Sequence, residues 1–371
     1  MARETVDGRA FVRVWFRTEG CAFDKQGLCT MCNYGAGDGV PPDIVDQVRA
    51  ALAANPVAAA ATVLISPSGS MFDRREVPAD LRQALLSVVA QTPAAAVICE
   101  TRSETVSAAA MRDFKAGLPG KTPVIEMGLE SSDPWVLRWC VNKRLDPAEF
   151  ADAVRVCDQA GVKTLANVAL GSAFLSPAAA LRDAITTAQW AVDAGVGGCV
   201  LFPLHVREWT LLGWLWRQGL YKPPSLWSLI EVLRAVKPRR PGQLSTAWYR
   251  DYHEGHPVEK AALPILASPT TCPACVDSVL ALLDDFRDSG NVAAFDALLA
   301  DPCACRQEWA DGLGEPGVDL GHVAECYKAI ADGLMPERWW DGHGEGLVAD
   351  MLASASTSLA REQAAPRLRP L

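Results

Sequence analysis

The chain has 371 residues, half of them hydrophobic, so it can bury a large core and is predicted to hold one large domain and a smaller one, which excludes a peptide or a disordered tail. Its formal net charge is -9 with no long Lys/Arg run, so charge does not favour a nucleic-acid-binding surface. Apolar stretches such as residues 57–65 are too short to span a bilayer, and the N-terminal nine residues are polar and charged. We therefore expect a cytoplasmic protein that does not enter a membrane.

Apolar strands alternate with helical stretches as far as residue 235. We predict strands at residues 10–16, 61–66, 95–99, 123–128, 163–169 and 198–202. We predict helices at residues 43–54, 78–90, 104–116, 146–160, 178–194 and 208–235, with Pro223 and Pro224 ending a Trp-rich helix inside the last stretch. Six such units with apolar strands favour a parallel sheet covered by helices, either a partial barrel or a doubly wound sheet.

The alternation stops after residue 240, and the remainder is helical and carries cysteines. We predict a partial (β/α)6 TIM-like barrel over residues 1–240 and a smaller, mainly helical domain over residues 241–371. Sites of such barrels lie where strands end, and polar residues stand at those places here. They are residues 66–70, 100–102, 130–132, Asn167, His205 and Arg207.

Three cysteines, Cys21, Cys29 and Cys32, share one loop directly after the first strand. Twelve cysteines with two tight groups indicate metal ligation and buried thiols in a reducing compartment, not a disulfide framework. Three thiolates can bind three irons of a [4Fe-4S] cluster and leave the fourth iron open. The alternative is a zinc loop that still needs a fourth ligand. The three cysteines follow the first strand and precede a series of β–α units, and this position favours an iron-sulfur cluster over a zinc loop.

Several segments resemble the radical S-adenosylmethionine (radical SAM) superfamily, in the branch that holds the radical SAM subunit of archaeosine synthase and, more distantly, the elongator catalytic subunit. The matching segments are residues 29–35 (CTMCNYG), 68–73 (SGSMFD), 76–78 (EVP), 100–102 (ETR), 128–132 (GLESS), 142–143 (NK) and 215–228 (LWRQGLYKPPSLWS). The resemblance implies a [4Fe-4S] cluster on Cys21, Cys29 and Cys32. It also implies S-adenosylmethionine on the open iron, cleaved by one electron to a 5′-deoxyadenosyl radical that abstracts hydrogen.

The resemblance also implies cofactor-binding roles. It places Ser68, Gly69 and Ser70 beside the methionine end of S-adenosylmethionine, Glu100 and Arg102 near its amino group or ribose, and Glu130 and Ser132 near its ribose or carboxylate, with Asn167 as a further candidate. Each has a plainer alternative: Gly69 permits a turn, Glu100 and Arg102 form a surface pair, and Glu130 caps a helix.

Two residues are candidate catalytic groups. Cys140, close to the Glu130 loop, could donate hydrogen to quench a radical, although a small buried side chain also explains it. His205 follows the sixth strand, where the resembled family carries asparagines and this chain has Phe202 and His205. That departure puts the family's substrate in doubt.

A second cysteine group comprises Cys272, Cys275, Cys303 and Cys305. Two close pairs are typical of structural zinc, which is our first interpretation. An auxiliary iron-sulfur cluster with His322 or Cys326 as extra ligands is the rival, and four buried thiols without metal is the third interpretation. His253 and His256 are spaced for a metal, but their polar surroundings favour a solvated turn.

We therefore predict a radical SAM enzyme that abstracts hydrogen from a small amino-acid-like or nucleoside-like metabolite in a biosynthetic pathway, with flavodoxin or ferredoxin as reducing partner. The runner-up is a tRNA-modifying enzyme of the archaeosine synthase type, acting on a lysine-modified deazaguanine base, although the net charge does not support tRNA binding. A non-catalytic iron-sulfur or zinc protein is the hypothesis from another class.

Overall fold

The computed structural model describes residues 2–6, 9–35, 37, 39–250, 264–300, 303–314 and 317–362. At its centre an eight-stranded sheet runs in the order β1-β2-β3-β4-β5-β6-β7-β9. β1 pairs antiparallel with β2, and the remaining neighbours pair in parallel. The strands are β1 (Ala2–Val6), β2 (Arg9–Phe16), β3 (Thr62–Pro67), β4 (Ala96–Thr101), β5 (Thr122–Glu130), β6 (Lys163–Leu170), β7 (Gly198–Pro203) and β9 (Leu244–Thr246).

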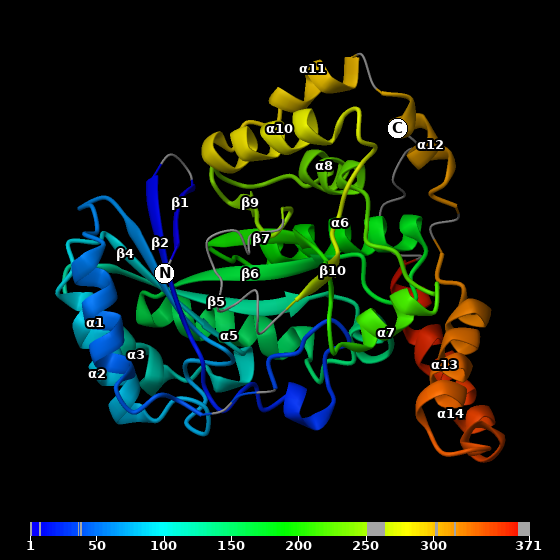
Figure 1. Cartoon of the computed structure of the whole chain (residues 1–371), viewed down its shortest axis with the longest axis horizontal. Coiled ribbons are helices and arrows are strands. Elements are labelled where there is room, and N and C mark those ends of the chain that lie inside the picture. Colours follow the sequence, from blue (N-terminus) through cyan, green and yellow to red (C-terminus); the bar gives the residue numbers. More distant parts are fainter. Residues whose placement is uncertain are drawn as a thin grey trace.

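Helices follow the parallel strands and cover the sheet (Figure 1). The first part of the chain supplies α1 (Ile44–Ala54), α2 (Ala79–Ala90), α3 (Ala108–Ala116), α4 (Pro134–Val136), α5 (Pro147–Ala160), α6 (Pro177–Asp193), α7 (Leu211–Arg217) and α8 (Leu226–Ala235). The remainder supplies α10 (Val276–Ser289), α11 (Ala294–Ala300), α12 (Ala304–Asp311), α13 (Leu320–Leu334) and α14 (Trp339–Glu362). Short 3₁₀ turns η1 (Asp24–Gln26) and η2 (Ser103–Thr105) and a π-helix η3 (Leu137–Val141) lie in the loops.

The apolar strands are buried on both faces, as parallel strands under helices must be. In β3, Val63 and Ile65 are fully buried in the core that the helices cover. Leu64, between them, packs inside the barrel with Ile98 and Val124. The predicted partial barrel with a mainly helical, cysteine-bearing C-terminal part is therefore confirmed.

The C-terminal helices attach to the barrel at two places. α10 contacts both β1 and β9, the two edge strands of the sheet, and so lies across the open seam of the barrel. α13 and α14 pack beside α4, η3 and α7. The indole of Trp135, on α4, donates to the carbonyl of Met351, on α14. The hydroxyl of Tyr327, on α13, donates to the carbonyl of Trp139, on η3. Figure 1 shows α13 and α14 at the opposite end of the molecule from α1, α2 and α3.

Some elements differ from the sequence prediction or add to it. β9 extends the parallel sheet beyond residue 240, because its three residues pair with β7; the domain boundary at residue 240 stays a prediction. A small antiparallel pair, β8 (Val206–Arg207) and β10 (Ile265–Ala267), was not predicted either. The stretch 208–235 holds two helices, α7 and α8, separated by Pro223 and Pro224. None of the helices described has the length and apolar character needed to cross a bilayer.

Candidate active site

The loop between β2 and α1 places Cys21, Cys29 and Cys32 on the wall of one cavity of about 1300 Å³. The loop is closed by a backbone hydrogen bond from Cys21 N–H to the carbonyl of Tyr34 at 2.8 Å. A Cβ on Gly37 would lie 2.1 Å from the carbonyl oxygen of Thr18, so only glycine permits this crossing of the chain. The beginning and end of the loop therefore cross closely, and the three thiols lie on the short segment between them.

The π-helix η3 supports the middle of the same loop. Cys29, in the left-handed backbone region at φ 61°, donates its N–H to the carbonyl of Asn142 at 3.1 Å. Thr30 donates its N–H to the carbonyl of Val141 at 2.9 Å and its hydroxyl to the carbonyl of Cys140 at 2.9 Å. π-helical turns leave carbonyls outside the regular pattern and occur often at functional sites. Here these carbonyls fix the backbone on either side of a thiol.

The donor set fits a [4Fe-4S] cluster. Burial raises the pKa of Cys29 to about 12 and the pKa of Cys32 well above its ordinary value, so the thiols favour the neutral form unless a metal draws off their protons. The loop offers three thiols and no fourth. A closed zinc site takes four ligands, whereas a cluster that keeps one iron open takes three.

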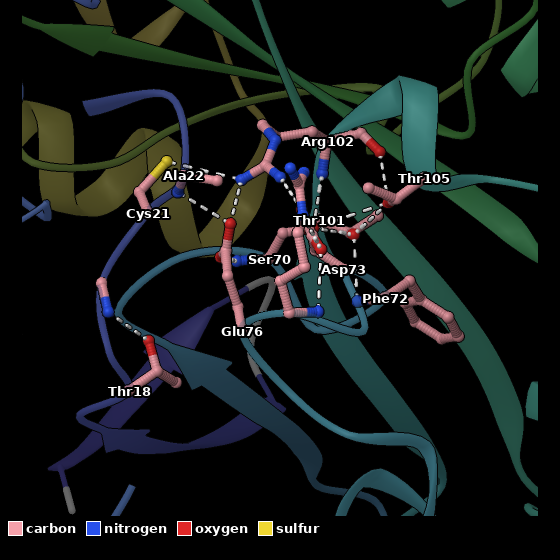
Figure 2. A network of polar contacts seen from close by, with 12 residues as sticks. Thr18, Cys21, Ala22, Ser70, Phe72, Asp73, Glu76, Thr101, Arg102 and Thr105 are labelled. Carbon is pink, nitrogen blue, oxygen red and sulfur yellow. Dashed lines mark hydrogen bonds and ion pairs between the residues drawn. The ribbon is translucent and has the colours of Figure 1, made fainter. Parts of the chain in front are cut away.

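A buried cation adjoins the first thiol. Arg102, 8% exposed, follows β4 and donates from Nη1 to Cys21 Sγ at 3.4 Å. The guanidinium also donates to three carboxylates: Nη1 to Glu76 at 2.7 Å, Nε to Glu104 at 2.7 Å and Nη2 to Asp73. Figure 2 shows the guanidinium between Cys21 on one side and Asp73 on the other, with Glu76 reaching it from below.

A second buried cation lies near Cys29. Lys143 donates to Glu130 Oε1 at 3.2 Å and to the carbonyl of Gly128 at 2.6 Å. Burial lowers the pKa of Lys143, but the charges of Glu130 and Cys29 outweigh it and leave the pKa above its ordinary value. Glu130 has a positive φ of 66° at a β-bulge, and its Oε2 is buried with no hydrogen-bond partner among the described residues. This atom can accept from a ligand in the cavity.

Charged and polar side chains also line the interior of the barrel. Burial raises the pKa of Glu126 above its ordinary value. A hydrogen bond from Asn167 and the charge of Arg13 act in the opposite direction but are smaller. Asn167 Oδ1 is buried without a partner among the described residues. Glu100, on β4, accepts a hydrogen bond from the hydroxyl of Ser66. The interior therefore combines these polar groups with the apolar cluster of Leu64, Ile98 and Val124.

The structure brings most of the predicted site residues to this cavity. Its wall includes Cys21, Cys29, Cys32, Gly69, Glu100, Arg102, Glu130, Asn167 and His205. Its wall does not include Ser68, Ser70, Ser132 or Cys140. The functional roles of all these residues stay predictions.

The four residues outside the wall have partners within the protein. Ser68 Oγ accepts from Thr18 N–H at 2.9 Å, and Ser70 Oγ accepts from Arg102 N–H at 3.2 Å. Ser132 N–H donates to the hydroxyl of Thr187, on α6. Cys140 is fully buried in the apolar cluster beneath α13 and α14.

His205 joins three segments at the mouth of the barrel. Its Nε2 donates a hydrogen bond to the carbonyl of Trp248, and its Nδ1 shares a hydrogen bond with the Ser268 hydroxyl at 3.1 Å. Both ring nitrogens therefore have protein partners, and the ring is 5% exposed. These bonds hold the segments after β9 and β10 against the end of β7.

Several residues at the site were not assigned a role from the sequence. Glu76 and Lys143 stand inside motif segments, and their burial as charged residues is visible only in the structure. Arg13 had a signal: a charge at an inward position of the otherwise apolar strand 10–16. Trp248, whose ring lies 4.8 Å from the guanidinium carbon of Arg13, had none.

The second cysteine group lies where α10 and α12 begin. The thiols of Cys272, Cys275, Cys303 and Cys305 lie within 4.8 Å of one another. Hydrogen bonds from the other three thiols lower the pKa of Cys272 to about 7. His322 and Cys326 are not in this group and instead contact each other at 3.6 Å. His253 and His256 lie outside the described residues.

No protein-family model matches the chain. Two curated relatives are both named archaeosine synthase subunit beta. The one from Methanosarcina acetivorans is 29% identical over 314 residues, which cover 80% of this chain and 83% of the relative. The one from Thermococcus kodakarensis is 28% identical over 240 residues, 61% of this chain and 72% of the relative.

Two solved structures are distantly similar. Methanocaldococcus infernus Elp3 with an N-terminal deletion has a TM-score of 0.49 at 16% identity and covers 76% of this chain and 63% of its own. Methylornithine synthase (PylB) has a TM-score of 0.49 at 15% identity and covers 94% of this chain and 87% of its own. At these scores neither likeness bears on activity. By sequence, the chain is similar over most of its length to archaeosine synthase subunit beta, which confirms its resemblance to that radical SAM branch.

Proposed function

We propose that the chain is a radical SAM enzyme that abstracts hydrogen from a small amino-acid-like or nucleoside-like molecule. The observation that carries the proposal is the set of three thiols, Cys21, Cys29 and Cys32, on the wall of a cavity inside the barrel. Three thiolates would ligate three irons of a [4Fe-4S] cluster and leave the fourth without a protein ligand from this loop. The similarity to archaeosine synthase subunit beta, over 80% of this chain, supports the same assignment.

When bound, a [4Fe-4S] cluster with S-adenosylmethionine would supply one-electron reductive cleavage and a radical able to abstract hydrogen. The chain's own residues would hold and enclose these groups. Cys21, Cys29 and Cys32 would ligate the cluster, and Glu130 Oε2 would accept from an amino or hydroxyl group of S-adenosylmethionine. Gly69 lets the carboxylate of Glu76 approach the backbone closely, since a Cβ there would lie 2.1 Å from a carboxylate oxygen of Glu76.

The cavity supports a second, small occupant. Its volume of about 1300 Å³ exceeds the roughly 300–1,000 Å³ of ordinary small-molecule pockets. Inside it, Glu126, Asn167 and Arg13 offer a carboxyl, an amide and a guanidinium to a polar substrate. Groups of both signs suit a molecule that carries an amino group and an acidic group. Free metabolites of this kind fit a chain of net charge -9.

A modified base in tRNA is the second candidate substrate. One observation favours it: the named relatives are subunits of archaeosine synthase. The word subunit in that name also points to a partner protein, which would supply basic surface for tRNA to a chain of net charge -9. Turnover of isolated tRNA, and none of free amino acids or nucleosides, would decide for this candidate.

The test of the enzyme assignment is cofactor cleavage. The full chain is reconstituted with iron and sulfide without oxygen, reduced with dithionite, and given S-adenosylmethionine, and 5′-deoxyadenosine is measured. Wild type and Cys157→Ala, which removes a buried thiol on α5 that is not part of the cavity wall, should both form it. Cys29→Ala should form none. Equal product from Cys29→Ala and wild type, or zinc without iron in the wild type, would contradict the assignment.

For the second cysteine group we propose a single structural zinc ion. A tetrahedral ion with bonds of about 2.3 Å places sulfurs about 3.8 Å apart. In the structure, three of the six sulfur pairs lie at 3.5 Å (Cys272 to Cys275), 3.4 Å (Cys272 to Cys303) and 3.4 Å (Cys275 to Cys305), and all lie within 4.8 Å. A cluster binds each thiolate to a different iron and spreads the sulfurs further apart. The close spacing therefore favours one ion over the auxiliary cluster.

A further inference from the structure

Arg102 is a buried cation shared between three carboxylates and one candidate cluster ligand. Four of its contacts are to Glu104, Glu76, Asp73 and Cys21. One face of the guanidinium also lies over the ring of Phe23, whose centroid is 4.8 Å from Cζ. A guanidinium has five N–H donors. Most of the binding capacity of Arg102 is therefore used inside the protein.

One of the carboxylates that hold Arg102, Glu76, also holds the loop of Cys21. Glu76 is 2% exposed, and its Oε1 accepts the N–H of Ala22, the residue after Cys21, at 2.9 Å. Its Oε2 accepts the N–H of Ser70 at 2.5 Å. Glu76 thus connects the cysteine loop with the loop after β3, and Arg102 joins the two by its salt bridge to Glu76 (Figure 2). The arrangement fixes where Cys21 Sγ lies relative to Nη1.

A donor at a cluster sulfur has a known physical consequence. Reduction adds negative charge to the cluster and its thiolates, so an N–H group or a positive charge beside a thiolate stabilises the reduced state more than the oxidised state. Nearby carboxylates act in the opposite sense. The reduction potential of a cluster on Cys21 should therefore respond to Arg102 and to the charges that neutralise it.

We propose that Arg102 is a positioning residue for the cluster: it holds Cys21 in place and donates a hydrogen bond to its sulfur, which raises the reduction potential. This differs from the contact with S-adenosylmethionine predicted from the sequence. It rests on the proposed function, because it requires a cluster on Cys21. Arg102→Lys keeps the charge but loses the planar fork that reaches Asp73, Glu76 and Cys21 together.

The experiment is a redox titration of the reconstituted full chain, followed by the electron paramagnetic resonance signal of the reduced cluster, with binding of S-adenosylmethionine measured on the same samples. At a fixed potential, Arg102→Lys should lower the ratio of reduced to oxidised cluster about fivefold, the equilibrium equivalent of one hydrogen bond. Its affinity for S-adenosylmethionine should stay near that of wild type. Arg75→Gln is the matched control, since Arg75 pairs with the same Asp73 but its side chain is 71% exposed, and it should leave the ratio nearly unchanged.

A second variant guards against loss of folding in Arg102→Lys. Glu104→Gln removes a partly exposed carboxylate from Nε, on the side away from Cys21, and should raise the ratio because the guanidinium is then less neutralised. Unchanged ratios in both variants, or weaker S-adenosylmethionine binding by Arg102→Lys at an unchanged ratio, would overturn this inference alone. A wild-type chain that takes up no iron would overturn the proposed function and this inference with it.

Discussion

The two cysteine groups of this chain are built in contrasting ways. Cys21, Cys29 and Cys32 lie on a loop that faces a cavity, and buried cations lie beside two of them. Cys272, Cys275, Cys303 and Cys305 face one another within 4.8 Å at the starts of two helices. A three-thiol set leaves a metal position for a reactant, whereas four converging thiols complete the shell of one ion. The number and convergence of thiols thus separate a candidate reactive centre from a structural one.

Cys32→Ser gives the sharpest break between the two groups. Loss of one of three ligands should abolish 5′-deoxyadenosine formation and most iron binding, because no other thiol on the loop can replace it. The zinc that we propose for the C-terminal group should remain, since its ligands lie on other elements. Metal analysis and product assay on the same sample check both statements. Zinc lost together with iron would show that the groups depend on each other.

Cys275→Ala should have the reverse effect. Removal of one of four ligands should release zinc and destabilise the fold by about 5 kcal/mol or more, because binding energy at such a site is folding energy. Thermal unfolding of wild type with a strong chelator should show the same loss. Iron uptake at the N-terminal loop should persist at low temperature. An unchanged melting temperature with zinc gone would contradict a structural role.

Lys143→Met tests the cation near Cys29. The side chains of Lys143 and Glu130 are 8% and 10% exposed, so the variant leaves a buried carboxylate without its charge partner. We expect a loss of about 3–5 kcal/mol in the free energy of unfolding. The double variant with Glu130→Gln should recover much of it, as denaturant titration would show. No recovery would mean that packing of the lysine stem, and not the ion pair, supplies the stability.

The sequence predicted the barrel and the two cysteine groups well because both depend on local patterns. Strands such as 61–66 are apolar on both faces, and the spacing of the cysteines can be seen in the sequence without knowledge of the fold. It did not predict which polar residues meet. Ser68 and Ser70 flank Gly69 in the motif, yet their side chains bond within the protein while Gly69 lines the cavity. The direction in which a side chain on a turn points depends on contacts between segments far apart in the sequence, such as the hydrogen bond between Thr18 and Ser68.

Short elements that depend on distant partners were also missed. β9 has three residues, too few for a periodic signal, and it forms because β7 offers an unpaired edge. Trp248 lies two residues after the end of β9 and contacts both Arg13 and His205. The segment after β9 therefore contacts β2 and the end of β7, which lie far from it in the sequence. Local sequence patterns do not predict such contacts between distant segments.

Trp227→Phe has the smallest expected effect and sharpens the account of the second group. The indole N–H of Trp227, on α8, donates to Cys305 Sγ at 3.2 Å, so it would stabilise a metal-bound thiolate and tie the zinc site to the barrel. Loss of this bond should cost about 1 kcal/mol and speed zinc release to a chelator. Trp309→Phe is the matched control, because its indole donates to Ser228 Oγ at 2.9 Å and not to sulfur. Equal release rates for both variants would mean that the tryptophans anchor α12 to α8 by packing, with no contribution to the metal.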